Sequence, residues 1–347
     1  MKTKTGRWIF PLLAGILILA FIGDLMFGSI RLSSKEFFDA LMGRSGDPNL
    51  SYIIWSLRLP KAITAILAGS GLALCGLLMQ TLFRNPLAGP FVLGVSSGAS
   101  LGVALLVMAS SWFGGNTLVH IFSYGQLGMV LAAMAGALLV MLLVILVSVR
   151  VADSVSILII GMMFGSATGA VVSLLQYFSD PDAVKSFLGW TFGDISAVTG
   201  EHLKLLGPLV IVGVLAGLGL KKPLNALMLG DNHARVIGVN VKRFRIIIIL
   251  VTSLLTGAIT AFTGPIAFVG LAVPHLARAI LRSSDHSRLT PATLMCGAII
   301  MLICDILAQL PASNQILPIN TVTAIFGAPV VIWVILRNRR GRTPLVS

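Results

Sequence analysis

The sequence predicts an all-α membrane protein with about ten transmembrane helices. Of its 347 residues, 56% are hydrophobic and only 11% are charged, whereas about 25% of the residues in ordinary soluble domains are charged. A soluble fold of this size would have too few charges to cover its surface. The apolar residues also come in long blocks, as bilayer-spanning helices require.

We expect one transmembrane domain over residues 1–347, with external loops at about 28–57 and 178–202 and a cytoplasmic loop at about 221–245. The predicted spans are, in chain order, residues 8–27, 60–82, 90–110, 126–148, 155–177, 203–220, 246–262, 265–281, 290–309 and 318–336. Lys2, Lys4 and Arg7 precede the first apolar run. That run is too long for a signal peptide, so we interpret it as a retained helix.

The basic residues indicate the orientation of the chain. The formal charge is +13, from 25 Lys and Arg against 12 Asp and Glu, and most basic residues fall in the loops that alternate spans place on one side. Acidic residues such as Asp180 and Asp182 fall on the other side. The positive-inside rule then predicts cytoplasmic N- and C-termini. The charges accordingly indicate a lipid bilayer as the surroundings and no nucleic acid partner.

The sequence contains no pattern typical of an enzyme, a cofactor site or a metal site. Cys75, Cys296 and Cys304 fall inside apolar segments without metal-ligand spacing. Asp305 is the one acid well inside a predicted span, with Asp24 near an outer end, so an ion-coupled secondary transporter has little support. No G-x-x-x-x-G-K-[ST] phosphate loop is present either. Any ATP must therefore be bound by another subunit.

The cytoplasmic loop contains a candidate short helix. Gly230-Asp231 offers an N-terminal start and Gly238 a C-terminal stop, one or two turns apart. From composition alone, a plain basic loop is an equally good interpretation.

Span five contains small residues at a strict spacing of four: Gly161, Gly165, Gly169 and Ser173. Such a stripe allows another helix to approach closely. It could serve packing, or a tight helix contact beside a moving pathway.

Several segments resemble the FecCD family, the permease subunits of ABC importers for iron-siderophores, haem and cobalamin. The resemblance covers nearly the whole chain from about residue 50, and the order and spacing of the segments make it specific. The matching segments are 58–61 (RLPK), 67–76, 84–90 (RNPLAGP), 93–99, 229–239, 264–271, 274–278 (PHLAR), 285–286 and 327–329.

The resemblance implies a type II ABC importer permease in a bacterial cytoplasmic (inner) membrane. Such a subunit pairs with an identical or paralogous permease, with the substrate path along the dimer axis. Two cytoplasmic ATP-binding subunits would dock below and an extracytoplasmic substrate-binding protein above. Iron-siderophore is the expected cargo, with haem and cobalamin as alternatives.

The resemblance also implies roles for particular residues. The residues of the loop that would enter the ATPase cleft are Gly230, Asp231, His233, Ala234, Arg235 and Gly238. Those of the inner gate are Asn85, Leu87, Ser154 and Val155. Arg58 and Lys61 match basic positions that meet acidic residues of the binding protein; interfacial snorkelling is the alternative.

A few positions depart from the family pattern or allow a second interpretation. Gln309 stands where the family often has Arg, and before the last span Ile316 and Asn320 replace the Glu and the Gly of the family's Glu-Leu-Pro-x-Gly. The first departure puts one docking contact in doubt, and the second the local helix geometry. His275 could suggest a haem ligand, although a lone His beside Pro274 is more often structural.

Overall fold

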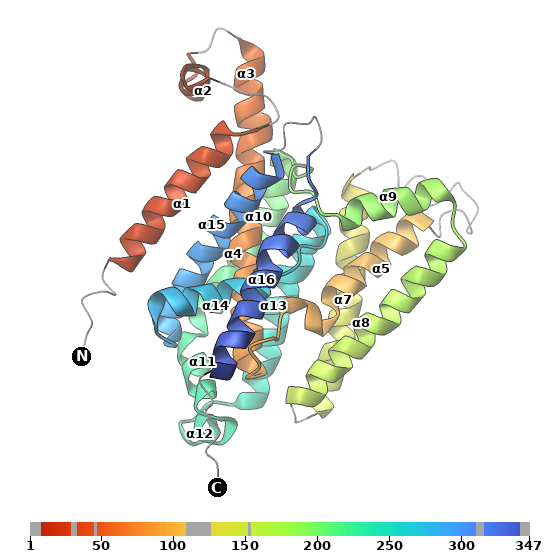
Figure 1. The fold of residues 1–347 in the computed structure, drawn as a ribbon. Coiled ribbons are helices and arrows are strands. Elements are labelled where there is room, and N and C mark those ends of the chain that lie inside the picture. Colours follow the sequence, from red (N-terminus) through yellow and green to blue (C-terminus); the bar gives the residue numbers. More distant parts are fainter. Residues whose placement is uncertain are drawn as a thin grey trace.

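A computed structural model describes residues 8–28, 33–44, 47–108, 126–151, 154–309 and 316–340. Within these ranges all regular secondary structure is helical (Figure 1). The elements are α1 (Ile9–Met26), α2 (Ser34–Leu41), α3 (Pro48–Tyr52), the π-helical turn η2 (Ile53–Arg58), α4 (Leu59–Leu82), the 3₁₀ turn η3 (Pro90–Leu93), α5 (Val95–Met108), α7 (Gln126–Arg150), α8 (Ser154–Tyr177), α9 (Pro181–Thr191), α10 (Gly200–Gly219), α11 (Lys221–Met228), α12 (Asp231–Val236), α13 (Val241–Thr263), α14 (Val269–Leu281), α15 (His286–Gln309) and α16 (Ile319–Arg340).

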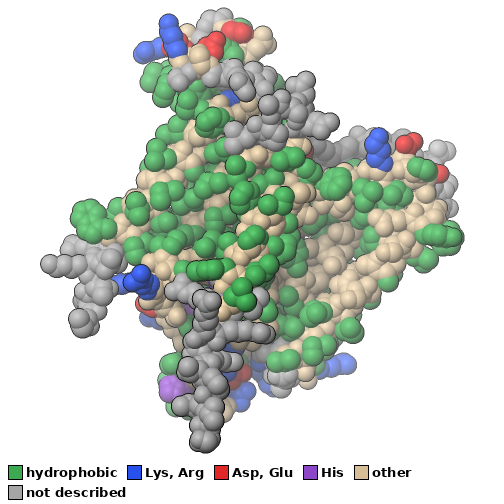
Figure 2. Space-filling view, viewed as in Figure 1, with side chains coloured by type: hydrophobic (Ala, Val, Ile, Leu, Met, Phe, Trp, Pro, Cys, Tyr) green, Lys and Arg blue, Asp and Glu red, His purple; other side chains and the backbone are tan. Residues whose placement is uncertain are grey.

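The helices confirm the polytopic membrane fold. In the described part of the chain, seven helices are long and apolar enough to cross a membrane, and three shorter apolar helices, within α5, α14 and α16, accompany them. Each corresponds to one predicted span. Figure 2 shows hydrophobic side chains spread over the flank of the molecule and charged side chains gathered towards its two ends. Lys2, Lys4 and Arg7 lie outside the described residues.

The helix that contains α4 begins earlier than predicted. The predicted span starts at Pro60, and proline lacks the N–H that an interior helical position donates. In the structure, helical backbone runs continuously from Pro48 to Leu82. The turn η2 precedes the proline, and Leu59 donates its backbone N–H to Ile54 O, five residues back. A π-type turn of this kind lets a helix continue past an irregular position.

Two predicted spans, 90–110 and 265–281, contain helices that start later than expected. Backbone in the left-handed region precedes each helix, at Gly94 (φ +71°) before α5 and at Phe268 (φ +65°) before α14. A Cβ on Gly76 of α4 would lie 1.5 Å from the carbonyl oxygen of Gly270 in α14. Only a glycine permits that approach.

The loops contain more helix than the sequence predicted. The first outer loop contains α2, whose start is a capping box in which Ser33 and Glu36 each bond the other's backbone N–H. The second predicted outer loop contains α9, and the loop predicted as cytoplasmic contains α11 before α12. These helices span only a few turns, so their hydrophobic periodicity is too brief to identify them.

The core centres on α4, which packs against α13, α14 and α15. Most of its residues are buried, and Figure 1 shows it surrounded by these helices. The small-residue stripe of α8 serves packing at one end: a Cβ on Gly161 would lie 2.5 Å from Val92 O of η3. A Cβ on Gly169, eight residues further along α8, would meet nothing within 4 Å.

Candidate coupling and gating site

The predicted short helix in the cytoplasmic loop is present as α12. Gly230, with φ +117°, precedes it, and Asp231 is its first residue. A carboxylate there interacts favourably with the partial positive charge of the helix N-terminus. Gly238, with φ +86°, follows the helix and donates its N–H to Arg235 O at 3.0 Å. The local signals at both ends were therefore correct, and the coupling role of this helix stays a prediction.

Exposed apolar side chains lie at and beside the two ends of α12, at a charged end of the molecule. Ala234 is fully buried and fixes the helix to the rest of the chain. Val236 is 85% exposed and Ile237 57%, and Leu229 just before the helix is 69% exposed. We call Leu229, Val236 and Ile237 the apolar tip. His233 and Arg235 lie exposed beside it.

The first predicted gate element lies between α4 and η3. Asn85 accepts the backbone N–H of Leu87 on its side-chain oxygen at 2.9 Å, which closes a tight turn. His275 of α14 donates its Nε2–H to Pro86 O at 2.8 Å. His275 thus holds this loop against α14. Among the described residues, no group of three or more His, Cys, Asp or Glu side chains could hold a metal ion.

The second predicted gate element opens α8. Ser154 is its first residue, although its side chain lies outside what the structure describes, and Val155 is 58% exposed. Figure 1 shows this end of α8 on the same side of the bundle as α12. α8 packs along η3 at Gly161, where a Cβ would lie 2.5 Å from Val92 O, so α8 contacts the segment that follows the turn at Asn85.

A network of polar side chains lies behind the first gate element. Arg278 of α14 donates to Gln80 Oε1 of α4 at 2.8 Å, and Gln80 Nε2 donates to Leu271 O at 3.1 Å. At the next residue of α4, Thr81 Oγ1 lies 2.9 Å from His286 Nε2. The sequence showed these residues only as scattered motif positions, since their partners are far away in the chain.

This network continues to the loop before α15. Asn225 of α11 donates to Asp285 Oδ1 at 2.7 Å, and its side-chain oxygen accepts the backbone N–H of His286 at 2.9 Å. The backbone N–H of Ser287, followed by the Asn225 amide, holds the pKa of Asp285 below its ordinary value of 3.8. The carboxylate is therefore ionised at neutral pH, and it joins α11 to α15.

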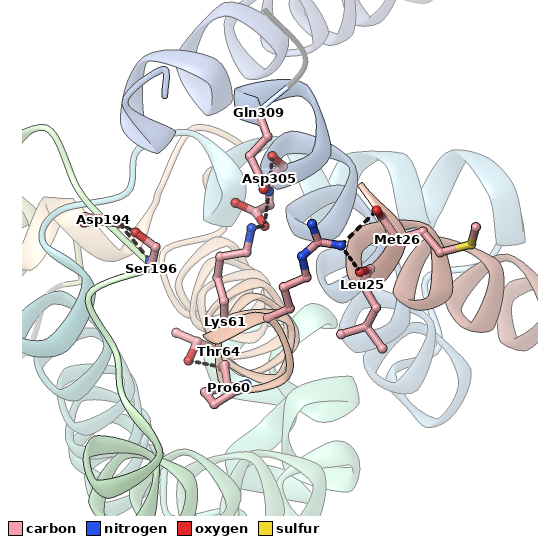
Figure 3. Close-up of polar contacts among 10 residues, drawn as sticks. Leu25, Met26, Pro60, Lys61, Thr64, Asp194, Ser196, Asp305 and Gln309 are labelled. Atoms are coloured by element: carbon pink, nitrogen blue, oxygen red, sulfur yellow. Dashed lines mark hydrogen bonds and ion pairs between the residues drawn. The ribbon is translucent and has the colours of Figure 1, made fainter. Parts of the chain in front are cut away.

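At the opposite end of the molecule, the two predicted docking residues are buried and point inwards. Arg58 donates to the carbonyl oxygens of Leu25 at 2.8 Å and Met26 at 2.9 Å. Lys61 Nζ lies 2.7 Å from Asp305 Oδ2, and Gln309 also donates to that oxygen, at 3.0 Å (Figure 3). Docking stays a prediction, but both side chains already have partners within the chain.

Sequence reasoning missed the extent of this outer cluster. Asp24 of α1 is fully buried, and its charged neighbours are Asp305, Lys61 and Arg58. The isolated acids at positions 24 and 305 were visible in the sequence, but their pairing was not. Beside the cluster, a cavity of about 210 Å³ is lined by Lys61, Asp305 and Asp194, among others.

The departures near the last span also find intramolecular partners. Asn320 accepts the backbone N–H of Ala267 on its side-chain oxygen at 3.0 Å. Its own N–H donates to Phe192 O at 3.2 Å, and Thr323 Oγ1 donates to Asn320 O at 3.0 Å. Asn320 therefore joins α16 to the segment before α14, and the structure gives these groups a packing role.

In the part of the chain that the structure describes, ten apolar helices pack around a buried core, which is the architecture of a polytopic membrane protein. A family model described as the FecCD transport family matches residues 16–337. The chain belongs to the FecCD transport family and is a permease of the ABC importer class.

Individual relatives extend over nearly all of the chain. The vitamin B12 import system permease BtuC of Vibrio cholerae is 34% identical over 97% of both chains. The hemin transport system permease HmuU of Yersinia pestis is 32% identical over 94% of this chain and 95% of the relative. A solved structure described as an inward-facing, metal-chelate type ABC transporter superposes with a TM-score of 0.80, at 28% identity, over 95% of this chain and 99% of the other.

Proposed function

We propose that this chain forms the translocation path of an ATP-driven importer. In this proposal, α12 receives the movement of an ATP-binding subunit and passes it to the rest of the chain. The observation that carries the proposal is the apolar tip: Val236, 85% exposed, ends the short helix α12, and Ile237, 57% exposed, directly follows it. Side chains of this kind on a charged, water-facing end mark a protein contact surface. A cytoplasmic ATP-binding subunit is the partner that the family membership suggests.

Hydrolysis of ATP then belongs to the partner subunits, and this chain has no catalytic group or cofactor of its own. The importer would comprise two permease copies, identical or paralogous, with two ATP-binding subunits below and a substrate-binding protein above. The basic residues around α12, such as Lys222 and Arg235, support a cytoplasmic location for this end and for both termini.

An iron-siderophore complex is the cargo that we propose. Support comes from the solved relative described as a metal-chelate type transporter. Haem and cobalamin are the second candidates, favoured by the names of the hemin and vitamin B12 permeases that resemble this chain.

Uptake by cells with and without the chain tests the cargo. Cells would be given iron-55 siderophore complex, haem or cobalt-57 cobalamin at equal concentration, and accumulation would be compared between a deletion strain and the complemented strain. The proposal expects chain-dependent accumulation of the siderophore complex alone. Chain-dependent uptake of haem or cobalamin instead would refute the cargo assignment and leave the importer mechanism standing.

A further inference from the structure

The loop at the first gate element is joined directly to α12 by one side-chain pair. Arg84 Nη2 donates to Asp231 Oδ1 and forms an ion pair with it. Arg84 immediately precedes Asn85, and Asp231 is the first residue of α12. We propose that Arg84 and Asp231 form the mechanical link that transmits displacement of α12 to the loop of residues 84–88. The inference rests on the proposed role of α12.

The backbone conformation at Arg84 supports its proposed role in transmitting movement. Its φ is +46°, in the left-handed region that side chains other than glycine seldom adopt. Leu82 ends α4 just before it, and the conformation at Arg84 turns the chain into the 84–88 loop. A strained position at the start of a moving segment is typical of switch regions.

The other side of Asp231 has a fixed anchor. Arg245 of α13 is only 4% exposed, and its Nη2 lies 3.7 Å from Asp231 Oδ2. The two oxygens of one carboxylate thus face two guanidinium groups from different elements. Because α13 lies in the core, Arg245 is expected to stay in place when α12 and Arg84 move.

The 84–88 loop has a second restraint on its opposite side. His275 Nε2 holds Pro86 O at 2.8 Å, and α14 is packed against α4. The loop therefore lies between a tether to the membrane core and a tether to α12. Movement of α12 would displace Arg84, at one end of the loop, while Pro86 stays bonded to His275. Such a displacement would change the shape of the turn at Asn85.

The exposure of the pair suits a link that carries movement more than one that holds the fold. The Arg84 side chain is 47% exposed and that of Asp231 37%. Exposed ion pairs contribute little to folding stability, since water and salt screen them. Replacing Arg84 should therefore leave the fold intact and alter the connection.

A double-mutant cycle in the complete transporter tests the link. Proteoliposomes would contain the permease, its ATP-binding subunits and its binding protein, with Arg84→Gln, Asp231→Asn or both. The measured quantity is cargo taken up per ATP hydrolysed, using the cargo that the wild-type accumulates. Each single variant should lower this ratio by about 3- to 10-fold, the size typical of residues that couple distant sites.

The combination of the two substitutions separates a shared link from two independent effects. The double variant should be no worse than Asp231→Asn alone, because that variant already loses the contact with Arg84 together with the one with Arg245. Arg84→Lys keeps the charge and should retain at least about half of the wild-type ratio. Unchanged ratios in the single variants, or effects that multiply in the double variant, would overturn the proposal.

Glu201→Gln supplies the matched control. Glu201 forms an exposed ion pair with Lys204 at 2.6 Å on α10, at the opposite end of the molecule. Its loss should leave the ratio unchanged. An equal drop in this variant would show that loss of any surface ion pair lowers the ratio, and would also overturn the link.

Amide hydrogen exchange of the purified permease alone distinguishes failure of the link from failure of the proposed function. Exchange in the peptide that contains residues 84–88 should become faster in Asp231→Asn and stay unchanged in Glu201→Gln. Faster exchange in a chain that binds no ATPase would keep the link and refute the role of α12. Unchanged exchange in a chain that does bind one would refute the link alone.

Discussion

Lys61 Nζ lies 2.7 Å from Asp305 Oδ2, and the two side chains are only 10% and 5% exposed. Lys61 is in the first turn of α4 and Asp305 near the end of α15, so the pair joins the start of one core helix to the end of another. Gln309, which replaces the arginine common in the family, donates to the same carboxylate. The pair gives Lys61 a structural partner where the family resemblance implies a docking role.

Breaking this pair should destabilise the protein. Lys61→Met leaves a buried carboxylate without its closest cation, and we expect a loss of about 3–5 kcal/mol in the free energy of unfolding. Lys61→Met combined with Asp305→Leu should recover most of it, because both charges are removed. Thermal unfolding in detergent measures the effect. A Lys61→Met protein with wild-type stability but weakened binding of the substrate-binding protein would favour docking instead.

The apolar tip of α12 should decide whether an ATP-binding subunit stays attached. Val236→Asp places a charge in the proposed contact and should lower the amount of co-purified ATPase about 10-fold, equal to about 1.4 kcal/mol. Leu188→Asp is the control, since Leu188 is 42% exposed on α9 at the other end of the molecule. Equal recovery of the ATPase with both variants would remove the tip from the interface.

Two glycines of one helix should respond differently to the same substitution. Gly161→Ala forces a Cβ against the backbone of η3 and should cost about 1–3 kcal/mol of stability. Gly169→Ala meets open space within the chain and should stabilise α8 by up to about 1 kcal/mol through helix propensity. Thermal unfolding of the two variants, compared with wild type, tests the packing. A destabilising Gly169→Ala would instead show that a second molecule packs there.

The contact through which the Asp285 carboxylate joins α11 to α15 should be sensitive to acid. Its pKa in the folded protein lies below 3.8, so its contribution to stability is present above that pH and is lost as the pH falls through the folded pKa. Asp285→Asn should therefore lower the unfolding temperature at pH 7, and the difference from wild type should shrink below about pH 4. A difference that stays constant with pH would show that the carboxylate charge does not stabilise the loop.

Much of the fold could be predicted from the sequence, because bilayer-spanning helices depend on length and apolar composition. The ten spans and the helix between Gly230 and Gly238 follow from such local signals. The continuation of helix through Pro60 could not be predicted, since it depends on a π-type turn that the surrounding packing stabilises. The late start of α14 likewise depends on a positive φ at Phe268. Phenylalanine, unlike glycine, does not indicate a positive φ in the sequence.

The candidate site divides in a similar way. Family motifs identified Asn85, Asp231 and His275 individually, but their contacts join residues far apart in the chain. Arg84 and Asp231 lie 147 positions apart in the sequence, and His275 and Pro86 lie 189 apart. Pairings over such separations are set by tertiary packing, so only the three-dimensional arrangement reveals that the loop is tethered on two sides.

Co-purification tests the central claim most directly. The tagged chain would be cross-linked in intact membranes, extracted in mild detergent and analysed by native mass measurement. The account predicts a complex of two permease chains with two copies of an ATP-binding subunit, which is lost on Val236→Asp. Recovery of the permease without any ATP-binding subunit, even after cross-linking, would contradict the account.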